Sequence, residues 1–225
     1  MSPQALIFDW DGTVVDLKRD WKELMIRAVW DSIPLSNDPA CLTTDFVALR
    51  TAHMSVYLRE TEGKHTNEQI EYIVQEMMNC IPDRLWHEHV PRQAINLYNA
   101  RMRDDAIKTI ASTRRDLIVN QAIEATLMSA TCPCYVVSGS TLIDIRDFAN
   151  RLDLLKHFRQ ILAYDQRLHP IFSKAQACKS ILDQLSCSNE QVWGFGDTKS
   201  DIDLYLGLGM RAFMVEGDQI VEMQA

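Results

Sequence analysis

Short apolar runs, each too short for a helix, constrain the fold of this chain more than any other feature. Between the later runs lie helix-length stretches, at residues 142–158 and 174–185. Strand-length segments that alternate with helices predict a parallel sheet with helices on both faces. The five runs are Ala5 to Phe8, Tyr135 to Ser138, Gln160 to Ala163, Val192 to Phe195 and Arg211 to Val215.

The interval after the first run breaks this alternation. From about Leu17 to about Ser112 no segment reads as a strand, whereas residues 21–33, 45–58, 66–78 and 93–107 have helical patterns. The sequence therefore predicts an α/β protein: a Rossmann-like parallel-sheet core with an α-helical cap domain inserted after the first strand. We expect residues 1–16 and 113–225 to form the core and residues 17–112 to form the cap.

The charge distribution limits the classes of ligand. The chain of 225 residues has a formal net charge of −8 and no polybasic run. Affinity for a nucleic-acid backbone comes from clustered Lys and Arg, so we expect no nucleic-acid partner. A small phosphorylated substrate stays compatible with this charge, because one Lys and a metal ion can bind it locally.

Targeting and redox signals predict a cytoplasmic protein. Two acids precede any apolar region of the kind found in a signal peptide, and no apolar run reaches about 18 residues. Six cysteines are scattered along the chain, and the pair Cys132 and Cys134 has no second pair at a zinc-like spacing. We expect reduced thiols and no membrane contact.

Two carboxylates follow the first predicted strand, in the sequence Asp9-Trp10-Asp11-Gly12-Thr13. Ligands of open parallel sheets bind at the carboxyl ends of the strands, where these acids fall. In an extended chain, residues i and i+2 point the same way about 6–7 Å apart. One carboxylate could then face a phosphorus atom while the other lies beside the leaving oxygen. The alternative is an acidic turn shaped by Gly12.

A second acidic motif, Gly196-Asp197-Thr198-Lys199-Ser200-Asp201, follows the fourth apolar run. Taken alone, it could be a capped helix start, since Asp stabilises helix N-termini. Together the two motifs would bring four carboxylates to one sheet edge, which is unfavourable unless a cation or protonation relieves the repulsion. Hard oxygen ligands beside a phosphate suit Mg²⁺, so Asp9, Asp11, Asp197 and Asp201 are the predicted metal-site residues.

Two further segments fit a phosphate site. Ser138-Gly139-Ser140 ends the second run and opens a helix, where a hydroxyl and backbone N–H groups can bind an anion. Lys174 begins a later helix behind Ser173. A lysine at that position is more often simply solvated, and its interest comes from its place in the series. Ser138, Gly139 and Lys174 are the predicted phosphate-binding residues.

In this order the motifs resemble the four motifs of the haloacid dehalogenase-like superfamily, and the insert resembles the helical cap of the subgroup with phosphoglycolate phosphatases and β-phosphoglucomutases. The resemblance implies Asp9 as nucleophile and Asp11 as general acid and base. It also implies phosphate binding by Ser138 and Lys174, and Mg²⁺ ligation by Asp9, Asp197 and the Asp11 carbonyl, supported by Asp201. In many relatives Pro follows the lysine, and Ser or Thr stands where this chain has Leu17.

The resulting prediction is a Mg²⁺-dependent phosphatase that hydrolyses a small phosphorylated metabolite through an aspartyl-phosphate. A phosphomutase or phosphotransferase would share every motif and differ only in the group that receives the phosphoryl. A non-catalytic binding protein on the same fold is the third alternative. The sequence indicates neither the oligomeric state nor the substrate. We interpret His87-Glu88-His89 as an exposed polar patch rather than a metal site.

Overall fold

The computed structural model describes residues 2–17, 20–33, 44–61, 66–78, 89–165 and 172–224. The chain divides into two compact units. One comprises Met1–Lys18 and Ile107–Ala225, and the other comprises Arg19–Ala106. The sequence placed the boundaries at 16/17 and 112/113. We call the first unit the core and the second the helical insert.

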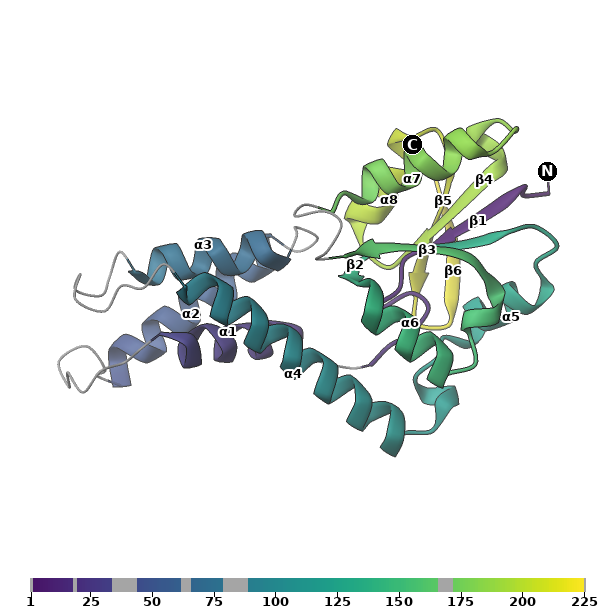
Figure 1. Ribbon diagram of the computed structural model, residues 1–225. Coiled ribbons are helices and arrows are strands. Elements are labelled where there is room, and N and C mark those ends of the chain that lie inside the picture. Colours follow the sequence, from purple (N-terminus) through teal and green to yellow (C-terminus); the bar gives the residue numbers. More distant parts are fainter. Residues whose placement is uncertain are drawn as a thin grey trace. The chain divides into compact units, whose positions relative to one another are not determined.

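The core contains a six-stranded sheet in the order β3-β2-β1-β4-β5-β6 (Figure 1). All neighbouring strands are parallel except β5 and β6, which pair antiparallel. The predicted α/β class with a Rossmann-like core is confirmed. The strands are β1 Ala5–Phe8, β2 Cys134–Thr141, β3 Phe158–Tyr164, β4 Val192–Gly196, β5 Arg211–Glu216 and β6 Gln219–Met223.

The last strand was not predicted from the sequence. β6 lies at the edge of the sheet. Of its first four residues only two, Ile220 and Val221, are apolar. Gly217, with φ of 58°, makes the turn that folds β6 back onto β5. None of the side chains of β6 is buried, so its hydrophobic pattern is weak.

Helices cover both faces of the sheet. In Figure 1, α7 (Lys174–Gln184) and α8 (Lys199–Gly207) lie on one side, and α5 (Gln121–Ser129) and α6 (Leu142–Arg151) lie on the other. The helix expected over 142–158 ends earlier, at Arg151. The chain then passes through the left-handed conformation of Asp153 and the short helix η4 (Leu155–His157) before β3 begins.

The two faces of the sheet have different packing. On the α7 and α8 face, aliphatic residues such as Ile7, Val137 and Ile181 form one buried cluster. On the other face Phe8, Phe195 and Phe213, which are aligned across β1, β4 and β5, stack with centroid separations of 4.8 and 4.9 Å. Side chains alternate along a strand, so Asp9, two residues after Ile7, belongs to the α7 and α8 face.

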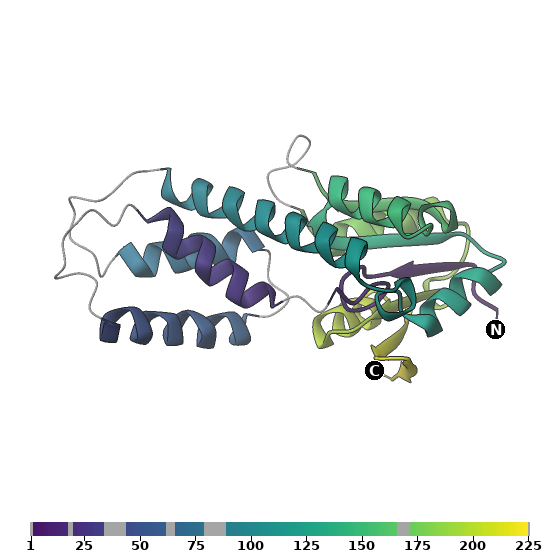
Figure 2. The ribbon, with the colours of Figure 1, turned by 90° about the horizontal axis from the view of Figure 1, so that it is seen from below.

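The helical insert has a hydrophobic core of its own, and its helices are drawn in Figure 2. Met25, Leu58, Ile70 and Ala94, one from each helix, are fully buried in it. The helices are α1 Trp21–Ser32, α2 Thr44–Glu60, α3 Thr66–Met78 and α4 Val90–Ser112. The division between the units falls inside α4. Among the described residues, no helix is both long enough and apolar enough to span a membrane.

Gly194 gives a stability test of the core. A Cβ at this position in β4 would lie 2.4 Å from Cγ of Tyr205, a buried ring of α8. Overpacking of this kind typically costs about 1–3 kcal/mol, and each kcal/mol shifts the Tm of a chain of this size by roughly 2–4 °C. We expect Gly194→Ala to lower the Tm by several degrees in a thermal melt.

The matched control is Gly207→Ala in α8, where an added Cβ meets nothing within 4 Å. Alanine is the better helix former, so this variant should melt at or above the wild-type temperature. A Gly194→Ala protein as stable as Gly207→Ala would contradict the packing of Tyr205 against β4.

Candidate active site

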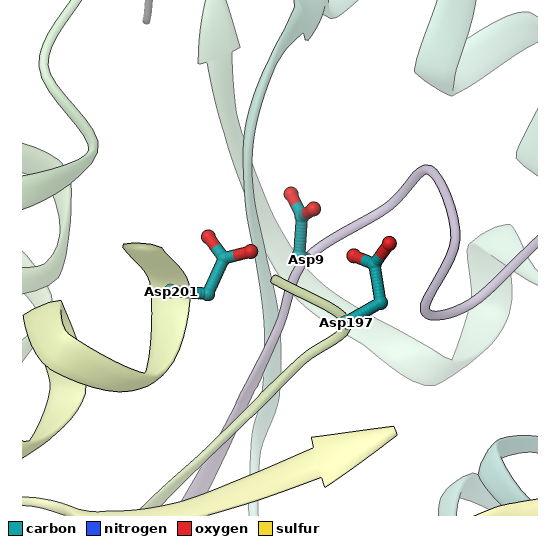
Figure 3. Close-up of side chains that lie close together, drawn as sticks. All are labelled: Asp9, Asp197 and Asp201. Carbon is teal, nitrogen blue, oxygen red and sulfur yellow. The ribbon is translucent and has the colours of Figure 1, made fainter. Parts of the chain in front are cut away.

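Three aspartates converge at the carboxyl end of the parallel strands (Figure 3). Each of Asp9, Asp197 and Asp201 offers a carboxylate oxygen, and these three oxygens lie within 4.8 Å of one another. Asp9 follows β1, Asp197 follows β4, and Asp201 lies in the first turn of α8. We call these three residues the carboxylate cluster. Two of them are nearly inaccessible: Asp9 is 6% exposed and Asp201 is 2% exposed.

Strand pairing brings the first two carboxylates together. β1 and β4 are hydrogen-bonded neighbours, and the ladder continues one step past β1, where the Asp9 N–H donates to the Phe195 carbonyl at 2.9 Å. Parallel strands end at the same edge of a sheet, so residues that are 188 positions apart in the sequence meet there. The predicted convergence of the two acidic motifs is therefore present for Asp9, Asp197 and Asp201.

Two glycines allow the close approach. Gly12 has φ of 79°, and a Cβ on it would lie 2.1 Å from Oδ2 of Asp197. A Cβ on Gly196 would lie 2.4 Å from Cβ of Asp201. Gly12 thus forms part of a turn, as the alternative interpretation predicted. That turn packs directly against Asp197 of the cluster. The backbone conformation and the lack of a side chain are both needed.

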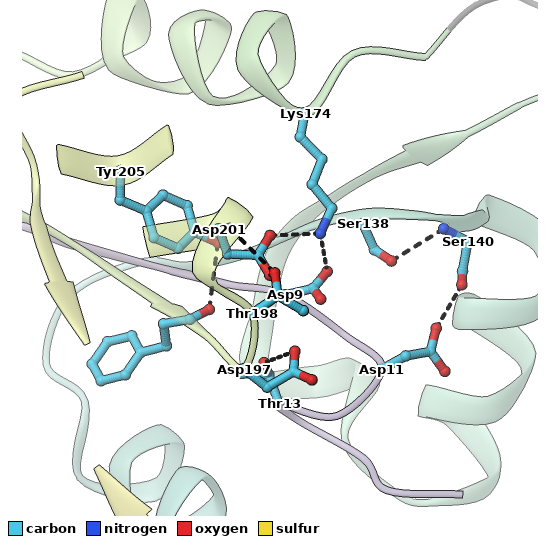
Figure 4. A network of polar contacts seen from close by, with 11 residues as sticks. Asp9, Asp11, Thr13, Ser138, Ser140, Lys174, Asp197, Thr198, Asp201 and Tyr205 are labelled. Atoms are coloured by element: carbon cyan, nitrogen blue, oxygen red, sulfur yellow. Dashed lines mark hydrogen bonds and ion pairs between the residues drawn. The ribbon is translucent and has the colours of Figure 1, made fainter. Parts of the chain in front are cut away.

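Lys174 bridges two members of the carboxylate cluster, as Figure 4 shows. Its Nζ donates to Oδ1 of Asp9 at 2.9 Å and to Oδ1 of Asp201 at 2.7 Å. Burial lowers the pKa of Lys174, but the two carboxylates more than offset this, so its pKa lies above the ordinary value and the ammonium stays charged. Ser173 positions Lys174 by capping α7, since its side chain accepts from the Gln176 N–H.

One ammonium does not neutralise three carboxylates. Burial, together with the charges of Asp201 and Asp197, raises the pKa of Asp9 to about 7 in spite of Lys174. Burial and the charge of Asp201 likewise raise the pKa of Asp197 to about 6. A divalent cation bound by hard oxygen ligands would supply the missing positive charge, so the donor set fits Mg²⁺. Asp9 and Asp197 are the residues best able to hold it.

Asp201 is already occupied by other partners. One of its oxygens accepts from Lys174, and the other accepts from the Thr198 hydroxyl at 2.5 Å. Thr198 is also the N-cap of α8, because its Oγ1 accepts from the Asp201 N–H. Asp201 therefore orients Lys174 and is a weaker candidate ligand than its two neighbours.

Asp11, the other predicted metal-site residue, lies outside the carboxylate cluster. Its Oδ2 accepts a hydrogen bond of 2.5 Å from the Ser140 hydroxyl. Ser138, buried at 3% exposure, accepts from the Ser140 N–H through its own hydroxyl at 3.2 Å. Gly139 between them is exposed, and a Cβ there would meet nothing within 4 Å. The Ser138-Gly139-Ser140 segment thus contacts the first acidic motif through Ser140.

Three hydroxyls in this network are absent from the predicted site residues. Thr13, fully buried, donates to Oδ1 of Asp197 at 3.2 Å, and Thr198 and Ser140 bind Asp201 and Asp11. The pattern Thr-x-x-Asp at residues 198–201 is a helix-start signal that could have identified Thr198. Nothing in the sequence links Ser140 to Asp11, which precedes it by 129 residues.

Other polar groups of the chain lie apart from this network. Of the His87-Glu88-His89 segment only His89 is among the described residues. It lines a pocket of about 400 Å³ on the helical insert with Arg92, Gln93, Asn96 and Leu97. The four cysteines in the described part of the chain are free. Cys178, one turn after Lys174 on α7, is fully buried, and burial raises the pKa of its thiol to about 12, which makes it unreactive.

Solved structures of several phosphate-handling proteins share this fold. A predicted phosphoglycolate phosphatase from Haemophilus somnus aligns with a TM-score of 0.62 and 13% identity, over 94% of this chain and 84% of its own. β-Phosphoglucomutase from Clostridium difficile gives 0.60 and 17%, over 94% and 83%. The hydrolase YfnB from Bacillus subtilis, solved bound to magnesium, gives 0.55 and 16%, over 94% and 88%. At these identities the likeness establishes the fold alone.

No curated protein matches this sequence. The family model of the haloacid dehalogenase-like hydrolases, by contrast, matches residues 3–204, which include β1 and β4 as well as the carboxylate cluster, Lys174 and Asp11. In the chain order, the helical insert lies between β1 and the remainder of the core, as the sequence predicted. The chain belongs to the haloacid dehalogenase-like hydrolase family.

Proposed function

We propose that this protein is a magnesium-dependent phosphatase that removes the phosphoryl group from a small phosphorylated metabolite. The observation that carries the proposal is the setting of Asp9: a buried carboxylate at a strand end, hydrogen-bonded to Lys174 and grouped with Asp197 and Asp201. A phosphoryl group carries negative charge, and this site sets the proposed nucleophile beside the ammonium of Lys174 and among carboxylates that could hold a divalent cation.

In the first half-reaction, an oxygen of Asp9 attacks phosphorus, and the bond from phosphorus to the leaving oxygen breaks. The product is an aspartyl-phosphate. Lys174 favours the ionised, nucleophilic form of Asp9 and offers its charge to the phosphoryl oxygens. The buried Ser138 hydroxyl and the N–H of the exposed Gly139 are the proposed donors to the same group. When bound, Mg²⁺ supplies positive charge that offsets the charge of the phosphoryl group and keeps the carboxylates ionised.

Asp11 is the proposed proton donor and acceptor. It protonates the leaving oxygen in the first half-reaction. In the second it takes a proton from water, whose oxygen attacks phosphorus and releases Asp9. The two aspartates have different surroundings: Asp9 faces Lys174 and two other carboxylates, whereas Asp11 accepts from Ser140. Different surroundings for two nearby carboxylates are typical of sites in which the two have different roles.

Two other functions could use the same residues. A phosphomutase would return the phosphoryl group from Asp9 to a second hydroxyl of the substrate, and β-phosphoglucomutase is among the proteins that share the fold. A non-catalytic binding protein would have no chemical need for an unneutralised carboxylate cluster. Release of inorganic phosphate, compared with formation of an isomeric phosphate ester, separates hydrolysis from mutase chemistry.

We also propose that residues 1–16 and 113–225 carry the chemistry, while residues 17–112 select the substrate. No proposed catalytic residue lies in the insert, which has its own hydrophobic core and a pocket that Arg92 and Asn96 help to line. A cytoplasmic location belongs to the same proposal, since the described cysteines are free thiols, as in a reducing compartment.

The mechanism predicts different outcomes for the two aspartates of the first motif. Asp9→Asn removes the nucleophile, so it should abolish both turnover and the mass increase of one phosphoryl group on rapidly quenched protein. Asp11→Asn keeps the nucleophile and loses acid–base help, which is typically worth roughly 100- to 10,000-fold in kcat. Phosphate release from a panel of phosphorylated metabolites gives the rates. Near-normal turnover by Asp9→Asn would refute the covalent mechanism.

The raised pKa values predict that stability depends on pH and magnesium. Burial raises the pKa of Asp9 from 3.8 to about 7 and that of Asp197 to about 6. A group with a raised pKa in the folded state destabilises the fold once pH rises through that value. The Tm of the metal-free protein should therefore fall between pH 5 and pH 8, with a smaller fall in Asp197→Asn. Mg²⁺ should raise the Tm more at pH 8 than at pH 5, and an equal increase at both would contradict the metal site.

Substrate selection by the insert can be tested at its pocket. Arg92→Ala and Asn96→Ala should change the relative kcat/KM among metabolites while leaving p-nitrophenyl phosphate within about threefold, because the chemistry is proposed to reside in the core. Gln184→Ala, at the exposed end of α7, is the control with a matched loss of a polar side chain. Equal losses on all substrates would show that the insert does not select.

A further inference from the structure

The hydrogen bond between Ser140 and Asp11 joins a residue that has no predicted role to the proposed proton donor. It joins segments that are 129 residues apart, from Ser140 Oγ to Asp11 Oδ2, over 2.5 Å. The Ser140 hydroxyl is the donor, and the Asp11 carboxyl oxygen is the acceptor. Figure 4 shows the pair beside the carboxylate cluster, with Ser138 next to it.

The backbone on both sides of this bond is fixed. On the Ser140 side, the Ser140 N–H donates to the Ser138 hydroxyl at 3.2 Å, and the next residue, Thr141, caps α6. On the Asp11 side, residues 11–16 form a turn in which the Gly12 N–H donates to the Val15 carbonyl at 2.8 Å. That turn is itself anchored, since the Asp16 N–H donates to Ile118 at 2.8 Å.

We propose that Ser140 is a positioning residue for proton transfer by Asp11, a role that rests on the function proposed above. Asp11 transfers its proton to the leaving oxygen: its O–H bond breaks, an O–H bond forms on the leaving group, and the P–O bond breaks. By binding one oxygen, Ser140 sets the rotation of the carboxyl group and thus the position of the other oxygen. Its donated hydrogen bond also stabilises the carboxylate that the step produces. Positioning of this kind governs the efficiency of general acid catalysis.

The dependence of the rate on the leaving group distinguishes this role from a structural one. An alkyl alcohol is a poor leaving group and needs protonation, whereas p-nitrophenolate is a good one and needs little. We therefore expect Ser140→Ala to lower kcat/KM for an alkyl phosphate, glycerol 2-phosphate, by about 10- to 100-fold. For p-nitrophenyl phosphate the loss should be below about threefold. Ser140→Thr, which keeps a hydroxyl, should recover most of the activity on the alkyl phosphate.

Two further variants complete the experiment. Thr141→Ala removes the neighbouring hydroxyl, which caps α6, and should leave the ratio of the two substrates unchanged. In the Asp11→Asn background, Ser140→Ala should cause no further loss on the alkyl phosphate, because the proton donor that it positions is gone. Activity on p-nitrophenyl phosphate reports whether each variant is folded.

Each outcome decides between the two proposals. Equal losses on both substrates, a loss confined to KM, or full activity of Ser140→Ala would overturn the positioning role and leave the proposed phosphatase function intact. A KM effect alone would mean that Ser140 binds the phosphoryl group instead. Wild-type protein that releases phosphate from neither ester nor any metabolite of the panel would overturn the proposed function and, with it, the role of Ser140.

Discussion

The carboxylate cluster around Lys174 is the interaction on which the rest of the site depends. Three aspartates lie with oxygens within 4.8 Å of one another, and two of them are almost completely buried. Removing carboxylates from water and placing them together is costly unless positive charge compensates them. Lys174 compensates in part, but burial and the neighbouring carboxylates still raise the pKa of Asp9 and of Asp197. A site with this imbalance is suited to a divalent cation.

The supporting contacts show how the fold maintains such an arrangement. Three of the carboxylates accept a hydrogen bond from a hydroxyl. Asp197 accepts from Thr13, Asp201 from Thr198 and Asp11 from Ser140. Hydrogen bonds to ionised groups are stronger than those between neutral groups, and they fix orientation as well as charge. Gly12 and Gly196 make room where backbone and carboxylate approach each other. The first motif and the fourth strand therefore act as one structural unit.

The residues proposed to react belong to one of the two units of the chain. All the residues proposed to react lie in the core, on the face covered by α7 and α8 or on the turn after β1. The helical insert folds around its own apolar residues, and its pocket is lined from α4 and the turn before it. Among the described residues, the three aspartates of the carboxylate cluster and Lys174 all belong to the core.

The sequence by itself determined five strands of the sheet, the helical character of the insert and the convergence of three of the four aspartates that it predicted to meet. Strand-length apolar runs and the acids that follow them are local patterns, and parallel strands must end at a common edge. Only the tertiary structure decided the rest. The strand β6 has too little apolar surface to be recognised, and the hydrogen bond of Asp11 to Ser140 joins residues far apart in the sequence. Contacts between hydroxyls and carboxylates over such distances have no periodic signal, because they depend on how the backbone packs rather than on neighbouring residues.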